Sequence, residues 1–97
     1  MLTSKQKRYL KSLGSVLDSV VQIGKAGINP SVVDGAEAVI AARELIKVRV
    51  LKNSPAEPRE AIEMLSRTVQ AELVQVIGRN GLLYRRNEEK PKIQLPE

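Results

Sequence analysis

Hydrophobic residues recur along the chain with two different spacings, and each spacing predicts one kind of element. Spacings of three and four residues, typical of a helix with one buried face, predict three helices at about residues 4–13, 30–42 and 58–70. Short apolar runs and strict alternation predict four strands at about residues 20–23, 45–51, 73–77 and 82–86. The predicted order is αβαβαββ, which is an α+β fold.

The second predicted strand alternates between apolar and basic positions. Ile46, Val48 and Val50 point to one side, whereas Lys47 and Arg49 lie on the other. A strand with one aliphatic side and one partly cationic side predicts a sheet that helices cover on one face only.

Basic residues gather on one side of the first predicted helix. Tyr9 and Leu10 belong to the side expected to pack, while Arg8 and Lys11 lie opposite, with Lys5 at the margin. No glutamate four residues away neutralises these charges. This side of the helix is therefore better suited to phosphate groups than to pairing within the protein.

The composition excludes several classes of protein. Ninety-seven residues with 42% hydrophobic content suit one globular domain. The chain has no cysteine and no histidine, and it has neither paired carboxylates nor a P-loop frame. We therefore expect no enzymatic activity, no cofactor, no metal and no small-molecule substrate. An aromatic content of 2% also argues against RNA-recognition motifs and OB-folds, which stack bases on several aromatic rings.

The two ends of the chain are polar. Residues 1–11 lack an apolar segment, and no apolar run approaches membrane-spanning length, so we expect a cytoplasmic monomer without a membrane partner. We divide the chain into a domain over residues 1–87 and a tail over residues 88–97. We expect the tail to be mobile unless Ile93 and Leu95 dock on the domain.

The positive charge is concentrated in the first half of the chain. Residues 1–52 carry nine Lys or Arg against four Asp or Glu, whereas residues 53–97 carry seven of each. The net charge of +5 therefore belongs to the first half. This asymmetry favours a polyanionic partner, with nucleic acid ahead of a membrane, over a basic surface kept only for solubility.

The same half contains a Gly-x-x-Gly loop at residues 24–27, Gly-Lys-Ala-Gly, between the first predicted strand and the second helix. The glycines let the main chain approach a ligand closely or take positive φ. Asn29 as N-cap and Pro30 at the first helical position start a helix whose positive dipole end attracts anions. The loop can therefore hold a phosphate group, although glycines at such a junction are more often plain turn residues.

A second glycine turn follows the third predicted strand. Asn80-Gly81 lies between two apolar runs and predicts a tight hairpin turn, which Arg79 precedes. If this turn and the Gly-x-x-Gly loop lie at the same end of the sheet, Lys25 and Arg79 form one basic rim. A simple hairpin remains the alternative explanation for Arg79.

Four segments together resemble the YhbY-like, or CRM-domain, RNA-binding proteins. They are the residues Leu2–Leu10, Val20–Gly27, Arg43–Val48 and Leu73–Arg79. The resemblance runs from about residue 2 to residue 86 in the family's order. It implies a four-stranded mixed sheet with helices packed on it, similar to the C-terminal domain of translation initiation factor three.

The resemblance also implies a function and a site. Stand-alone bacterial members are associated with the precursor of the large ribosomal subunit, so the implied partner is its ribosomal RNA and the implied role is ribosome assembly. The family's RNA-contacting loop falls on residues 24–27, where a common family loop has glycine in place of Ala26. A methyl group there is tolerated if Ala26 has negative φ.

The loop and the basic residues around it form the candidate site. Phosphate contacts position an RNA without specifying its sequence, and the scarcity of aromatic residues favours recognition of RNA shape. The candidate RNA-binding residues are Gly24, Lys25, Ala26, Gly27, Lys5, Arg8, Lys11, Arg43, Lys47, Arg49 and Arg79.

Two alternatives stay open at this point. Ile-Gly-x-x-Gly is also the signature of KH domains, but there the loop joins two helices, whereas here a strand is predicted before it. The basic surface could equally belong to a protein-interaction module that meets an acidic partner.

Overall fold

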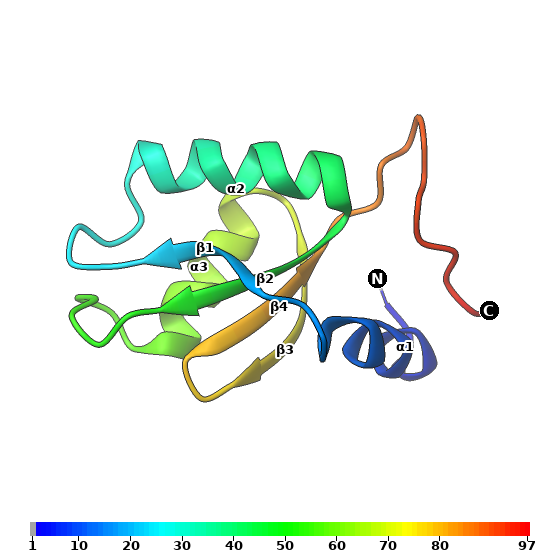
Figure 1. Cartoon of the computed structure of the whole chain (residues 1–97), viewed down its shortest axis with the longest axis horizontal. Coiled ribbons are helices and arrows are strands. Elements are labelled where there is room, and N and C mark those ends of the chain that lie inside the picture. Colours follow the sequence, from blue (N-terminus) through cyan, green and yellow to red (C-terminus); the bar gives the residue numbers. More distant parts are fainter. Residues whose placement is uncertain (1) are drawn as a thin grey trace.

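The computed structural model describes residues 2–97 and has the predicted order of elements (Figure 1). The helices are α1 (Ser4–Gly14), α2 (Pro30–Arg43) and α3 (Pro58–Thr68). The strands are β1 (Ser19–Ile23), β2 (Leu45–Val50), β3 (Glu72–Ile77) and β4 (Asn80–Tyr84). The α+β prediction is confirmed, and each boundary lies within two residues of its predicted place.

The strands form one mixed sheet in the order β1-β2-β4-β3. β1 and β2 are parallel, while β4 is antiparallel to both β2 and β3. β1, β2 and β3 therefore all end at the same edge of the sheet. We call this the loop edge, because it carries the loop after β1 (residues 24–29), the loop after β2 (residues 51–57) and the turn after β3 (residues 78–79).

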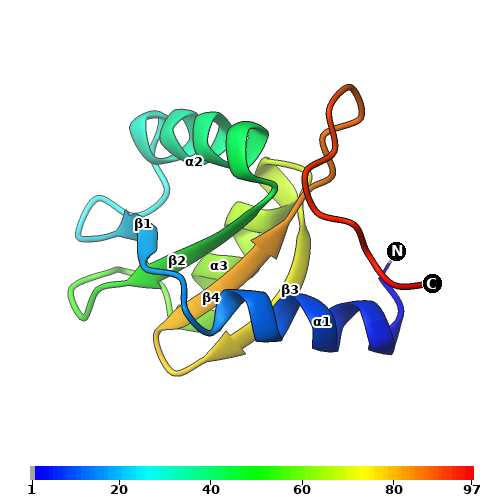
Figure 2. The ribbon, with the colours of Figure 1, turned by 45° about the vertical axis from the view of Figure 1, so that its right-hand side comes forward.

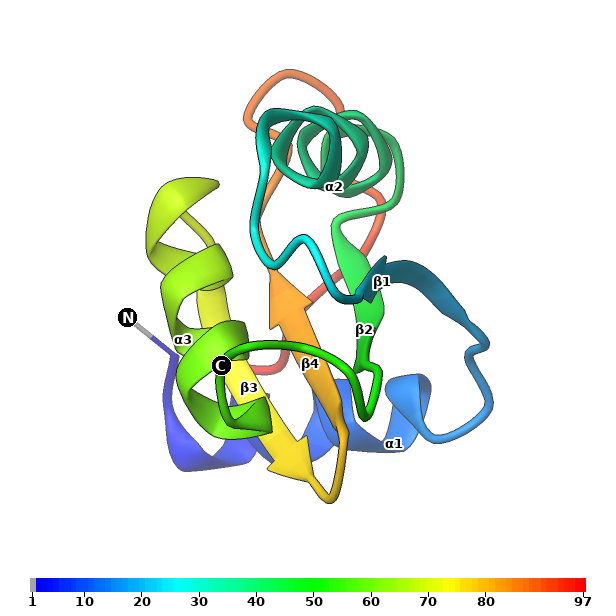
Figure 3. The same ribbon diagram turned by 90° about the vertical axis from the view of Figure 1, so that its left-hand side faces the viewer.

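One side of the sheet lies under α2 and α3, and we call it the closed face (Figure 3). Ile46, Val48 and Val50 of β2 point to this side and are buried with Ile40 of α2 and Leu65 of α3. The aliphatic side of the alternating strand thus forms the main core, as predicted.

The prediction that helices cover only one face is wrong, because α1 packs on the opposite side (Figure 2). Leu10 of α1 is fully buried in a second apolar cluster with Leu45, Leu82 and Tyr84. Gly14 allows this close approach, since a Cβ there would lie 2.5 Å from Leu82 Cδ1. We call this side the open face, because α1 leaves its part near the loop edge uncovered.

The hairpin turn between β3 and β4 lies two residues before its predicted place. Gly78 and Arg79 form the turn, and Gly78 takes the positive φ of 57°. Asn80 and Gly81 belong to β4 instead. Gly81 serves packing, because a Cβ there would lie 2.6 Å from Cγ2 of the buried Ile62.

The C-terminal tail docks on the open face, where Ile93 and Leu95 pack against the cluster around Leu10. Glu44, which is fully buried, accepts hydrogen bonds of 2.7 Å from the backbone N–H groups of Asn87, Lys92 and Ile93. We expected a mobile tail unless Ile93 and Leu95 docked on the domain, and both residues do dock. Burial raises the pKa of Glu44, but these three hydrogen bonds outweigh it and hold the pKa below its ordinary value.

Candidate nucleic-acid interface

The Gly-x-x-Gly loop is a β-turn that points its two central residues into solvent. The Gly27 N–H donates a hydrogen bond of 2.9 Å to the Gly24 carbonyl, and Gly27 has a φ of 67°. Lys25 and Ala26 between them are exposed. Ala26 is not among the residues with positive φ, so its methyl group causes no backbone strain.

Of the two glycines of this loop, Gly27 is the more tightly packed at the loop edge, whereas a Cβ on Gly24 would make an ordinary contact. A Cβ on Gly24 would lie 3.5 Å from Leu51 Cδ1, and one on Gly27 would lie 3.2 Å from Pro55 Cγ. The loop after β1 therefore lies directly against the loop after β2. The loop after β2 contributes Lys52, an exposed cation that is not among the candidate residues predicted from the sequence. Lys52 follows the end of β2 as Lys25 follows the end of β1, and this shared position was the signal that could have identified it.

The start of α2 has fewer N–H groups to offer a phosphate than its sequence implied. Asn29 Oδ1 accepts a hydrogen bond of 2.9 Å from the Val32 N–H, and the Asn29 carbonyl accepts one of 3.0 Å from the Val33 N–H. Pro30 has no N–H to donate. Since the N-cap occupies these donors, anion binding at this end of the loop depends more on the Lys25 ammonium group than on the helix.

Arg79 lies at the loop edge, as the rim prediction required. Its Nη1 donates a hydrogen bond of 3.3 Å to the Leu51 carbonyl, and its own carbonyl accepts one of 2.7 Å from the Val50 N–H. Arg79 therefore fastens the β3–β4 turn to the end of β2. Part of its guanidinium group has this structural task, which leaves the remaining N–H donors for a ligand.

Arg49 and Lys47 lie on the open face of β2. Arg49 is exposed and pairs in register with Gln22 of β1 and Asn80 of β4, next to the loop edge. Lys47 is half-buried one row further from that edge, where it lines a hollow together with Lys11 from the last turn of α1. The open face thus continues the basic character of the loop edge toward α1.

Three other candidate residues lie farther from the loop. α1 begins at the right-hand end of the molecule in Figure 1, opposite the loop, so Lys5 in its first turn is distant from Lys25. Arg43 is in the last turn of α2, which runs away from the loop, and Arg8 is in the middle of α1. Since the longest extent of the molecule is 39 Å, only an extended ligand could contact both ends.

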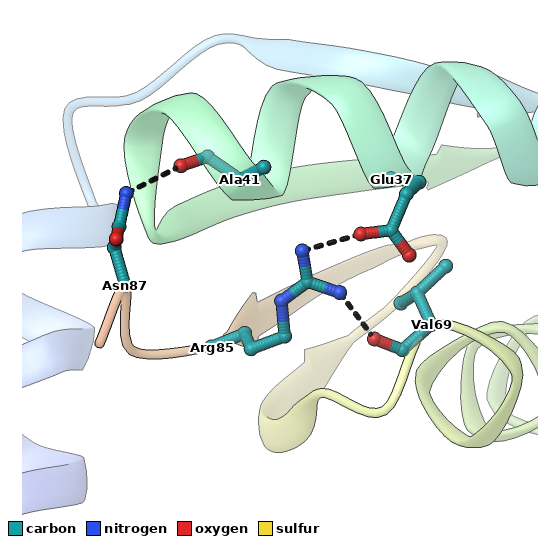
Figure 4. A network of polar contacts seen from close by, with 5 residues as sticks. All are labelled: Glu37, Ala41, Val69, Arg85 and Asn87. Carbon is teal, nitrogen blue, oxygen red and sulfur yellow. Dashed lines mark hydrogen bonds and ion pairs between the residues drawn. The ribbon is translucent and has the colours of Figure 1, made fainter. Parts of the chain in front are cut away.

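The basic side chains divide into paired and unpaired groups. Arg59 pairs with Glu63 at 3.2 Å. Figure 4 shows that Arg85 pairs with Glu37 and also donates a hydrogen bond of 2.9 Å to the Val69 carbonyl. Within residues 2–97, by contrast, seven candidate cations have no hydrogen-bond or ion-pair partner for their side chains. They are Lys5, Arg8, Lys11, Lys25, Arg43, Lys47 and Arg49.

A comparison with models of protein families shows to which family the chain belongs. The family model described as the CRS1 / YhbY (CRM) domain matches residues 2–85. The chain belongs to this family. The loop of this CRM domain joins a strand to a helix, which differs from the helix-to-helix arrangement of the KH alternative.

Relatives of this CRM domain are similar over their whole length. "Probable RNA-binding protein YqeI" of Bacillus subtilis is 40% identical over 96 residues, which is 99% of this chain and 100% of the relative. An "RNA-binding protein" of Haemophilus influenzae is 39% identical, over 98% of this chain and 95% of the relative. The family and these relatives are RNA-binding proteins and not enzymes.

A solved structure has the same fold. The hypothetical protein SAV1595 of Staphylococcus aureus, described with its solution structure as a candidate RNA-binding protein, superposes with a TM-score of 0.82. It is 47% identical, and the match covers 99% of this chain and all of that chain. Among residues 2–97 we find no helix with the length and apolar character needed to cross a membrane.

Proposed function

We propose that this CRM domain binds RNA through the loop edge and the adjoining open face. The observation that carries the proposal is that within residues 2–97 Lys25, Lys52 and Arg49 make no ion pair there. On the side of α2 and α3, by contrast, Arg59 and Arg85 have carboxylate partners. An unpaired cation retains its full attraction for phosphate groups. When it neutralises a phosphate, a counterion is released from the RNA. The names of the relatives support the same partner.

The contacts would form in two parts. Lys25, Lys52 and Arg79 at the loop edge would hold phosphates of one backbone segment, which could approach the turn at its exposed residues Lys25 and Ala26. Arg49, Lys47 and Lys11 would then contact the same RNA strand where it crosses the open face. Since these parts lie on different elements, the arrangement suits a folded RNA more than a short unstructured strand.

The proposed target is ribosomal RNA of the large-subunit precursor, and the proposed role is that of a ribosome assembly factor. This finer assignment rests on the resemblance to stand-alone bacterial CRM proteins. The test is to crosslink the protein to RNA in growing cells and to sequence the attached RNA. Enrichment of large-subunit precursor sequences over mature ribosomal RNA supports the role, while an even distribution over cellular RNA contradicts it.

Binding itself can be tested with purified components. We expect the logarithm of the affinity for a ribosomal RNA fragment to fall steeply with the logarithm of the salt concentration. We also expect that fragment to bind more tightly than a random RNA of equal length. Equal affinity for the fragment, random RNA and an acidic polypeptide would contradict specific RNA recognition and favour the interaction module with an acidic partner.

A further inference from the structure

A hollow of about 260 Å³ opens on the open face, between the end of α1 and the β3–β4 hairpin. Lys11 of α1 and Lys47 of β2 line one part, and Gln75 of β3 and Asn80 of β4 line another, with Leu82 among the apolar lining residues. This volume lies just below the range of about 300 to 1,000 Å³ that is typical of pockets for drug-sized ligands. It therefore suits one small planar group more than a whole cofactor.

The sheet register fixes how these side chains are arranged. Lys47, Leu82 and Gln75 form one row across β2, β4 and β3, and Asn80 lies in the next row toward the loop edge. With strands about 4.8 Å apart, the first row extends over about 10 Å. The row thus has a cation, Lys47, at one end and an amide, Gln75, at the other.

Four of the polar side chains that line the hollow have no partner within the described part of the chain, whereas the Ser15 hydroxyl donates a hydrogen bond of 2.9 Å to the Ser12 carbonyl. Over residues 2–97, none of the side chains of Lys11, Lys47, Gln75 and Asn80 makes a hydrogen bond or an ion pair. Of the described residues, 2–97, those that line the hollow include no carboxylate. The charge therefore favours an anionic ligand, and the two amides add donors and acceptors in defined positions.

Resting on the RNA-binding function proposed above, we propose that this hollow receives one unpaired nucleotide, with adenosine preferred. Lys11 and Lys47 would hold its phosphate, while the amides of Gln75 and Asn80 would bind the edge of its base. Side-chain amides pair with the N6 and N7 atoms of adenine, where they both accept and donate a hydrogen bond. Leu82 and the largely exposed Ile77 (63% exposed) would supply apolar contacts to the base.

The end of α1 supports a base that carries an amino group. Gly14 and Ser15 line the hollow at the C-terminal end of this helix, where the carbonyl groups have partial negative charge. The Gly14 carbonyl already accepts a hydrogen bond of 3.1 Å from the Leu17 N–H, and its second lone pair could accept one from the amino group of adenine. Uracil has only its ring N–H to donate. The hollow would therefore distinguish bases, which the phosphate contacts at the loop edge cannot do.

The test uses three RNA hairpins with the same stem: one fully paired, one with a single unpaired adenosine and one with a single unpaired uridine. We expect the wild-type chain to bind the adenosine hairpin about fivefold more tightly, or better, than the other two, because one bidentate amide contact gives at least that discrimination. Gln75→Met and Asn80→Leu should each remove the preference without changing the affinity for the paired stem. The matched control is Gln22→Met, an exposed glutamine on the same face of β1 outside the hollow, which should keep it.

A direct readout on the unaltered protein accompanies the variants. The side-chain NH₂ signals of Gln75 and Asn80 should shift in NMR spectra when the adenosine hairpin is added, but not with the paired stem. If RNA binds in a Lys25-dependent way and these signals stay unchanged, the hollow proposal is overturned and RNA binding stands. If no hairpin binds, the function proposed above fails as well. If the signals respond to an acidic peptide and not to RNA, the hollow belongs to a protein partner.

Discussion

The two faces of the sheet are built from the same four strands but are completed in different ways. On the closed face, two helices bury Ile46, Val48 and Val50. Two arginines on this side, Arg59 and Arg85, pair with carboxylates. On the open face, one helix and the tail bury a smaller cluster, and Lys47 and Arg49 are left without partners within residues 2–97. The closed face thus pairs two of its arginines inside the protein, whereas Lys47 and Arg49 on the open face keep their charge for a ligand. Stability and binding should therefore respond to substitutions in different places.

The strongest test of this division is Leu65→Ala on the closed face. Leu65 is fully buried, so we expect a loss of about 2–5 kcal/mol in the free energy of unfolding from lost apolar contact and the cavity that remains. Urea unfolding measures this loss. The neighbouring Met64→Ala, at a side chain that is 42% exposed, should change the free energy by about 0.5 kcal/mol or less. RNA affinity at low urea should be unchanged in both variants, and a parallel loss of affinity would break the comparison.

Glu44→Gln tests how the tail completes the open face. The substitution replaces the ionised acceptor of three backbone N–H groups with a neutral amide, so we expect a loss of about 1–3 kcal/mol at neutral pH. Because the folded pKa of Glu44 is lowered from the ordinary value of 4.5, its contribution is complete above that value. The contribution disappears as the pH falls through the lower folded pKa.

The measurement is thermal unfolding of wild type and variant between pH 7 and pH 2. The difference between the two should be largest at neutral pH and should shrink in acid. Amide exchange at Lys92 and Ile93 should also become faster in the variant at neutral pH. A difference that is independent of pH would show that the Glu44 charge does not hold the tail.

Comparing Lys25→Gln with Arg67→Gln tests whether a positive charge contributes to RNA binding only when it lies at the loop edge. Both side chains are exposed, and Arg67 lies in the last turn of α3 on the closed face. We expect Lys25→Gln to weaken RNA binding and to lower the slope of log K against log salt by about one. Arg67→Gln should leave the slope unchanged. Equal effects would mean that the RNA senses only the net charge of +5.

The smallest expected effect belongs to Ala26→Gly, which restores the common family loop. Because Ala26 has no positive φ to relieve, glycine should only add freedom to the unfolded chain and lower stability by about 0.4–1 kcal/mol. Thermal unfolding measures the loss, and RNA affinity should remain unchanged. A clear gain in affinity would show that the Ala26 methyl group hinders the approach of RNA.

The elements could be predicted from the sequence because their signals are local. Asn29 and Pro30 mark the start of α2, and the alternation in β2 identifies the buried side of the sheet. The second helix-covered face could not be read from β2 alone, because Leu45 and Leu82 meet α1 only after the chain has folded. Gly81 misled the turn prediction, since its closeness to Ile62 is a tertiary contact.

The site was predictable only in part for the same reason. The sequence identifies the loop and the basic residues as types, but their grouping depends on the parallel direction of β1, β2 and β3. Because the three strands run in the same direction, Lys25, Lys52 and Arg79 lie at the same edge of the sheet. Glu44 carried no local signal at all: it is a charged residue at a φ of 68°, a conformation more often taken by glycine, and its buried carboxylate binds residues more than 40 positions away.

The docking of the tail brings the two ends of the chain together. The Gln6 Nε2 donates a hydrogen bond of 3.0 Å to the Pro96 carbonyl, and both ends lie at the right of Figure 1, away from the Gly24–Gly27 loop. Copies of such a unit can be joined by short linkers without threading chain past the loop edge. The fold is therefore suited to tandem repetition, with each copy presenting its own loop on the side away from the linkers.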